Sequence, residues 1–110
     1  MIGGKSTVHG FYQGEPILQW ELARDLSVSC RTPLVLHGAT GLEDQVLNEL
    51  IDMGFRKVNF ATGMRVAFLT GIRNCLTGAS DLIKPQVYLK CGRKSVDSLV
   101  SHILDLVMLE

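Results

Sequence analysis

The segment 33–41, which reads Pro-Leu-Val-Leu-His-Gly-Ala-Thr-Gly, constrains the fold more than any other part of the chain. An apolar run that follows proline and ends at glycine is typical of a buried strand in a parallel sheet, so we predict a strand over 33–36. His37 then lies at the carboxyl end of this strand. Gly38 and Gly41 permit a tight turn in which backbone N–H groups can approach an anionic ligand. The segment therefore combines an imidazole with a candidate anion site.

Two further strands are predicted, over 2–8 and 56–60. The first ends at His9 and Gly10, and it is weak because it contains two glycines. The second contains Asn59, and asparagine is a poor strand former. Asn59 is interpreted either as a turn-forming residue at the strand end or as an amide that binds a substrate oxygen.

Amphipathic helices are predicted between and after these strands, because apolar residues recur at helical spacing. Alternation of strands and helices implies parallel strands with right-handed crossovers, so the fold class is α/β. In such sheets ligand-binding residues gather at the carboxyl ends of the strands. The predicted helices begin at Glu15 and Pro16, at Glu43, at Thr62 and at Lys94, and a short helix is predicted over 86–90 within a connection over 79–92.

Composition excludes several classes of function. A chain of 110 residues holds one domain at most, and its formal net charge of zero gives no electrostatic reason to expect a nucleic-acid partner. No apolar run approaches the roughly 20 residues that a membrane helix needs, and no secretory leader is visible, so a membrane partner is not expected. Cys30, Cys75 and Cys91 are widely spaced, which favours free thiols in a reducing cytoplasm over a zinc site.

Each candidate functional residue also has an ordinary structural interpretation. A single histidine after a strand is more often a loop or structural residue than a ligand, but His9 and His37 each precede a glycine, which favours a shared metal or substrate. Glycine turns are common after strands, so the turn over 38–41 is a weak phosphate signature. His102 is interpreted as a flanking residue of the last helix. The basic cluster is interpreted as a solvated surface, and it comprises Lys84, Lys90, Arg93 and Lys94.

Three segments together resemble one family, the class II, zinc-dependent ketose-bisphosphate aldolases. Residues 7–16 resemble its HG-x-Y-x-G-E-P segment, residues 33–41 its LVLHGxSG segment, and residues 57–62 its KVNxAT segment. The three segments occur in the same order as in the family, and the resemblance covers nearly the whole chain. The segment 57–62 is more similar to the tagatose-bisphosphate branch than to the branch with aspartate at the position of Ala61.

The resemblance implies a fold and an activity. It implies that residues 1–110 form the C-terminal part of a (β/α)8 barrel, namely its last three strand–helix units and a C-terminal helix. It implies a cytoplasmic lyase of glycolysis and related carbohydrate metabolism. The reaction would cleave a ketose 1,6-bisphosphate, of tagatose or fructose, to dihydroxyacetone phosphate and glyceraldehyde 3-phosphate. Such a reaction passes through an enediolate, whose developing charge a divalent metal ion stabilises.

The resemblance also assigns roles to residues. His9 and His37 match zinc-ligand positions, and Asn59 matches the residue that contacts the substrate's oxygens. A monovalent cation near the phosphate is also implied. The positions that match the phosphate-binding residues are Gly10, Gly38, Thr40, Ala61 and Thr62.

The chain differs from the family pattern at two positions, and it lacks a match to two of the family's site residues. Thr40 replaces a serine, and Gly63 replaces a glutamate, which weakens the start of that helix by up to roughly 1 kcal/mol. No segment matches the family's catalytic aspartate or third zinc histidine, and the complete barrel typically needs about 250 residues. We therefore expect no catalytic residue in this chain and no aldol cleavage by it alone.

Two alternatives to an aldolase part stay open at this point. One is a truncated remnant that binds phosphate weakly, forms a homo-oligomer, or associates with a partner supplying the missing barrel half. The other is a small phosphate-binding α/β module without a metal.

Overall fold

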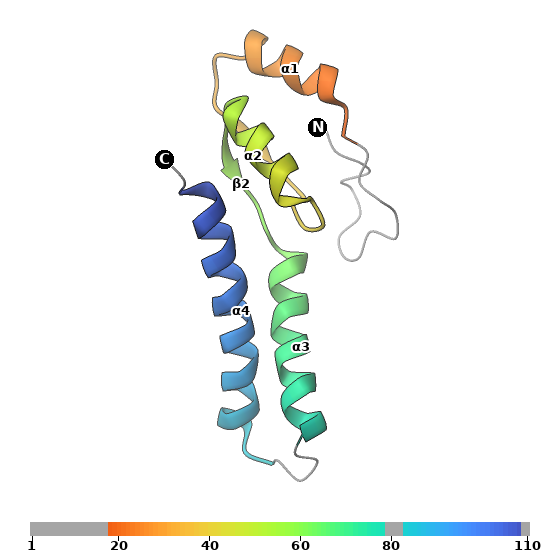
Figure 1. The fold of residues 1–110 in the computed structure, drawn as a ribbon, viewed down its shortest axis with the longest axis vertical. Coiled ribbons are helices and arrows are strands. Elements are labelled where there is room, and N and C mark those ends of the chain that lie inside the picture. Colours follow the sequence, from red (N-terminus) through yellow and green to blue (C-terminus); the bar gives the residue numbers. More distant parts are fainter. Residues whose placement is uncertain (1–17, 79–82, 109–110) are drawn as a thin grey trace. The chain divides into compact units, whose positions relative to one another are not determined.

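The structure is a computed structural model that describes residues 18–78 and 83–108. The chain divides into two compact units, Met1–Thr62 and Gly63–Glu110. The predicted strand over 2–8 lies outside the described residues. The elements are α1 (Trp20–Ser29), β1 (Leu34–Leu36), α2 (Asp44–Asp52), β2 (Phe55–Val58), α3 (Thr62–Gly78) and α4 (Pro85–Val107), and Figure 1 shows them in order.

The centre of the first unit is a strand–helix–strand arrangement. Strands β1 and β2 pair in parallel, with Val35 opposite Lys57 and Leu36 opposite Val58. Helix α2 connects the two strands and contacts β2. The predicted parallel pairing is therefore confirmed, although β2 ends one residue before Asn59 rather than extending through residue 60.

A small apolar core holds this unit together. In α2 the predicted apolar stripe is confirmed, since Leu47 and Leu50 are buried on one face. Leu50 is fully buried, and burial of such a side chain stabilises the fold by about 1.5–3 kcal/mol. The other buried apolar side chains in the described part of the chain are Ala23, Leu36, Ala39 and Phe55.

Helix α1 differs from its prediction. The predicted start at Glu15 and Pro16 lies outside the described residues, and the helix begins only at Trp20 because Gln19 has a non-helical backbone conformation. Leu22 of the predicted apolar face is 38% exposed, whereas Ala23 is buried. The predicted apolar face is confirmed only at Leu26, which is half-buried, because Leu18 lies before the helix. The residues predicted for this face were Ile17, which lies outside the described residues, Leu18, Leu22 and Leu26.

The second unit is a pair of helices that lie antiparallel and side by side, α3 and α4 (Figure 1). The predicted start of α3 at Thr62 is confirmed, and so is the prediction that Gly78 ends this helix. The prediction that residues 79–92 are mostly a connection was wrong from residue 85 onward, because α4 is one continuous helix of 23 residues. The short helix predicted over 86–90 is confirmed as part of α4. Pro85 is at its start, where the missing N–H costs nothing. Gly92, which the prediction placed in the connection, is buried inside α4.

Two glycines allow the two helices to approach closely. A Cβ atom at Gly71 would collide with the Ser95 side chain and lie 2.6 Å from the carbonyl oxygen of Cys91. A Cβ atom at Gly92 would lie 2.8 Å from the ring of Phe68. Gly92 therefore serves helix packing and not a turn.

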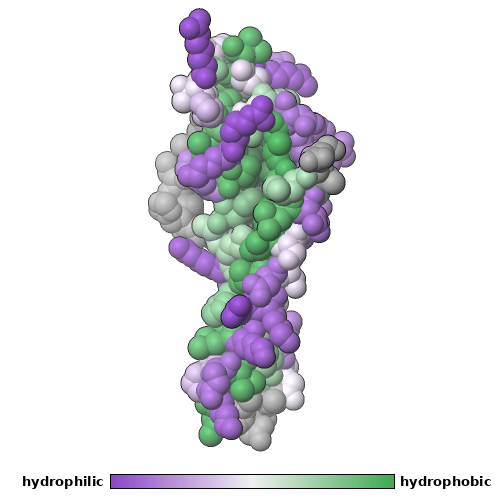
Figure 2. Space-filling model, turned by 90° about the vertical axis from the view of Figure 1, so that its left-hand side faces the viewer, coloured by the Kyte–Doolittle hydropathy of each residue, from purple (hydrophilic) through white to green (hydrophobic). Residues whose placement is uncertain are grey.

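The surface of the α3–α4 pair is mixed in character. Figure 2 shows hydrophobic and hydrophilic side chains interleaved along it on the face drawn. The predicted solvated cluster is confirmed, since Lys84, Lys90, Arg93 and Lys94 are all exposed, as is His102. Across the two described ranges, every helix is too short or too polar to span a membrane.

Candidate functional site

His37 and Asn59 are brought together by the pairing of the two strands. The backbone N–H of Asn59 donates to the carbonyl oxygen of Leu36 at 2.8 Å, which extends the ladder one residue beyond β2. His37 follows β1 directly and Asn59 follows β2 directly. At these strand ends the Asn59 Nδ2 donates a hydrogen bond to the His37 Nδ1 over 3.2 Å. The sequence placed both residues at one edge of a sheet, but their direct contact depends on the strand register.

The contact links the tautomer of His37 to the orientation of the Asn59 carboxamide. When the carboxamide nitrogen faces the ring it can only donate, so Nδ1 accepts and a neutral imidazole carries its proton on Nε2. A metal ion bound at Nε2 needs the opposite tautomer, in which Nδ1–H donates to an oxygen. A half-turn of the Asn59 carboxamide supplies that oxygen without moving the ring. His37, which is exposed, therefore fits as one nitrogen ligand for zinc.

The turn after His37 has the backbone conformation that its glycines predicted. Gly38 has φ of 69° and Gly41 has φ of 87°, a region that favours glycine. The N–H of Ala39 donates to the carbonyl oxygen of Asn59 at 3.4 Å, and the N–H of Leu42 donates to the carbonyl oxygen of Ala39 at 3.2 Å. The buried Ala39 thus fixes the turn to the sheet, while Thr40 is exposed at its tip.

Helices α2 and α3, which follow the two strands, differ in how well their first turns suit the binding of an anion. Helix α2 carries Asp44 in its first turn, directly after Glu43, and these carboxylates repel an anion. Helix α3 has no acidic residue in its first turn, which contains Arg65. The first N–H groups of a helix lack partners within the helix and favour negative charge. The start of α3, preceded by Ala61, is therefore the better candidate for phosphate than the start of α2.

Some of the remaining predicted site residues lie outside the described residues and others lie within them. His9 and Gly10 lie outside the described residues. Ala61 is exposed, and Thr62 is the first residue of α3. Within residues 18–78 and 83–108, no cluster of three or more His, Cys, Asp or Glu side chains could hold a metal ion.

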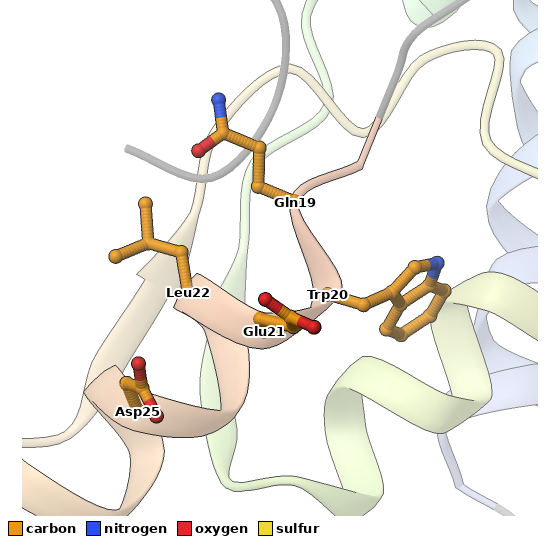
Figure 3. Close-up of a pocket in the computed structure, with 5 residues that line it drawn as sticks. All are labelled: Gln19, Trp20, Glu21, Leu22 and Asp25. Atoms are coloured by element: carbon orange, nitrogen blue, oxygen red, sulfur yellow. The ribbon is translucent and has the colours of Figure 1, made fainter.

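An open hollow lies along α1, away from the predicted residues. Figure 3 shows Trp20 and Leu22 pointing to opposite sides of that helix. None of the residues lining the hollow is predicted to bind metal or phosphate. They are Gln19, Trp20, Glu21, Leu22 and Asp25.

A contact between two cysteines was missed by the sequence reasoning. The Sγ atoms of Cys75 and Cys91 lie 2.6 Å apart across the two helices of the second unit. The hydrogen bond with Cys91, then burial, then repulsion by a Cys91 thiolate raise the pKa of the Cys75 thiol. All three cysteines are free, as predicted. The pairing would have been visible only if α4 had been predicted to begin at Pro85, because Cys91 was placed in a connection.

Residues 4–110 match the family described as fructose-bisphosphate aldolase class-II. The chain belongs to this family. The resemblance seen in the sequence is therefore confirmed over nearly the whole chain. The match also favours an aldolase part over an unrelated phosphate-binding module.

Two solved aldolases have similar folds. The YdjI aldolase from Escherichia coli K12 is 27% identical, with a TM-score of 0.73 over 91% of this chain and 36% of that one. The fructose-bisphosphate aldolase Fba from Campylobacter jejuni is 19% identical, with a TM-score of 0.72 over 93% of this chain and 37% of that one. The second likeness concerns the fold alone. The chain thus spans a little over a third of each aldolase, which agrees with a partial barrel.

Proposed function

We propose that these residues are the C-terminal part of a zinc-dependent class II aldolase that cleaves a ketose 1,6-bisphosphate, of tagatose or fructose. The products are dihydroxyacetone phosphate and glyceraldehyde 3-phosphate. The observation that carries the proposal is the His37–Asn59 pair at the carboxyl ends of β1 and β2, in a chain that matches the aldolase family over residues 4–110. In barrels of this type, active sites form at this end of the strands.

Each candidate residue has a role in this proposal. His37 and His9 are the zinc ligands that this chain supplies. The metal, when bound, supplies Lewis-acid stabilisation of the negative charge that develops on substrate oxygens. Asn59 orients the His37 ring and contacts the substrate's oxygens. The backbone N–H groups of the phosphate-binding residues hold the ketose phosphate, with a monovalent cation near it, and these residues are Gly10, Gly38, Thr40, Ala61 and Thr62.

The catalytic base and a third zinc ligand are not matched in these 110 residues. A catalytic zinc site uses about three protein ligands and a general base must reach the proton it removes. We therefore propose that these residues alone do not cleave the bisphosphate. The remaining barrel strands come from further chain or from a partner, including another copy, in the cytoplasm.

Zinc binding tests the role of His37. Competition with a chromogenic zinc chelator should show weaker zinc binding by His37→Ala than by the native chain. The matched control is His102→Ala, because His102 is an exposed histidine on α4. Equal zinc affinity in the native chain and His37→Ala would contradict the ligand assignment.

Binding of a product fragment tests the phosphate site. Dihydroxyacetone phosphate should move the backbone amide resonances of residues 38–41 and 61–62 in an NMR titration, whereas dihydroxyacetone without phosphate should not. In a coupled assay the same sample should release no dihydroxyacetone phosphate from the ketose bisphosphate. Turnover by the purified chain would contradict the proposed dependence on a base from outside these residues.

A further inference from the structure

The second unit contains a pair of thiols held within bonding reach. Cys75 lies on α3 and Cys91 on α4, and their Sγ atoms are 2.6 Å apart. An S–S bond is about 2.03–2.05 Å long, so only a small movement separates the two thiols from a disulfide. Both side chains are partly buried, so they remain in reach of a small oxidant.

The contact follows from the packing of the two helices. Gly71 and Gly92 let α3 and α4 approach to a distance that a Cβ atom at either position would prevent. Cys75 lies one helical turn beyond Gly71, and Cys91 is adjacent to Gly92. The two cysteines therefore lie beside the glycines that permit the close approach of the helices.

We propose that Cys75 and Cys91 form a site of reversible oxidation that links α3 to α4 by an intrachain disulfide. With hydrogen peroxide as oxidant, one thiolate attacks the O–O bond, which gives a sulfenic acid and releases hydroxide. The second thiol attacks the sulfenic sulfur, the S–S bond forms, and water leaves. The net reaction oxidises two thiols and reduces one peroxide to two waters. A dithiol such as dithiothreitol reverses the link by exchange.

The link has a physical consequence for this unit. It joins residues 16 positions apart and closes the intervening segment into a loop, which lowers the entropy of the unfolded chain. The oxidised pair of helices therefore resists unfolding more than the reduced pair. This inference does not depend on zinc, substrate or aldolase activity.

The test uses the full chain with Cys30→Ser, which removes one of the three cysteines and leaves only the two thiols in question. Cys30 is suitable for this substitution because it is exposed and lies outside the helix pair. After treatment with hydrogen peroxide and then N-ethylmaleimide, intact mass should show a monomer without label and lighter by two hydrogen atoms. Peptide mapping should recover a fragment that joins residue 75 to residue 91. Dithiothreitol should restore both labels, and oxidation should raise the thermal midpoint by about 5 °C or more.

Three comparisons decide the outcome. Linking should be at least about tenfold faster in the folded chain than in guanidinium, because the fold orients the thiols. Gly71→Ala in the same background should slow linking, whereas Gly78→Ala, which meets no atom within 4 Å, should not. Two labelled thiols after oxidation, a disulfide-linked dimer, or equal rates in folded and unfolded chain would each overturn the proposal.

Discussion

The hydrogen bond between Asn59 and His37 is the most informative contact at the scale of single residues. It couples the ends of two strands, and it links the orientation of the Asn59 carboxamide to the tautomer of an imidazole that we propose as a zinc ligand. Metal-bound histidines usually donate their other ring N–H to an oxygen, and this orients the ring. If the carboxamide oxygen of Asn59 faces the ring, it can accept this hydrogen bond from Nδ1–H. If the carboxamide nitrogen faces the ring, it donates to Nδ1 instead and opposes metal binding at Nε2.

Exchanging Asn59 for aspartate should reverse the tautomer of His37. A carboxylate can only accept, so Asn59→Asp requires the proton on Nδ1, whereas the native amide nitrogen places it on Nε2. Long-range 1H–15N correlation spectra distinguish the two forms of the neutral ring. The control is Asn74→Asp on α3, and a native spectrum in that variant is expected. An unchanged His37 spectrum in Asn59→Asp would show that the contact does not control the ring.

The Cys75 thiol should titrate at higher pH than an ordinary cysteine, whose pKa is 9.0. The hydrogen bond with Cys91 is the largest cause of the raised pKa, followed by burial and by repulsion from a Cys91 thiolate. The raised pKa means that the neutral thiol stabilises the fold below pH 9 and that this stability is lost as the pH rises through the folded-state pKa.

The pH dependence of Cys75 alkylation, followed by mass spectrometry of its peptide, measures this shift. Cys91→Ala should move the profile of Cys75 toward lower pH because it removes the hydrogen bond and the repulsion. A profile that is the same with and without Cys91 would assign the shift to burial alone.

At the scale of elements, the closest packing in the second unit is between two glycine-bearing helices. Glycine inside a helix costs about 0.5–1 kcal/mol relative to alanine, so Gly71 and Gly92 oppose helix formation. Both are buried where the neighbouring helix leaves no room for a Cβ atom. Packing between helices therefore outweighs helix propensity at these two positions.

Gly71→Ala should destabilise the helix pair by about 1–3 kcal/mol, because the new methyl group meets backbone atoms of α4 that cannot move independently. Gly92→Ala should cost less, since its nearest neighbour is the ring of Phe68, which can shift. Urea unfolding of the α-helical signal measures both. Gly78→Ala is the control, with a stability equal to or slightly above native. A stabilised Gly71→Ala would mean that the helices do not pack as described.

At the scale of the whole molecule, the chain consists of two units whose stabilising contacts differ in kind. In the part of the chain that the structure describes, the first contains a two-stranded parallel sheet and the core around Leu50, and the second contains a helix pair. Every described residue of the proposed active site belongs to the first unit, and both residues of the thiol pair belong to the second. Substitutions in the proposed site and in the thiol pair therefore fall in different units.

Leu50→Ala should lower the stability of the first unit by about 2–5 kcal/mol, because Leu50 is fully buried, while the second unit keeps its stability. Fluorescence of Trp20, the only tryptophan, reports on the first unit. Hydrogen exchange of α3 and α4 reports on the second. Leu22→Ala is the control, since Leu22 is 38% exposed and should cost less. Equal loss of stability by both probes would show that the units unfold together.

Much of the fold was determined by the sequence itself. Strand β1, helix α2 and helix α3 follow directly from apolar periodicity, from glycine positions and from the residues that begin helices. The family, too, was identifiable from three short motifs. Such features are local, so each can be recognised without knowing which segments meet in space.

The tertiary structure alone decided the features that depend on contact between distant segments. Helix α4 runs continuously through Gly92, which packs against Phe68 of α3, whereas the local pattern around residues 79–92 indicated a break. The His37–Asn59 hydrogen bond requires the register of two strands, and the Cys75–Cys91 contact requires two helices crossing at glycines. Their residue types were visible in the sequence, but close contact depends on three-dimensional packing, which the local pattern does not encode.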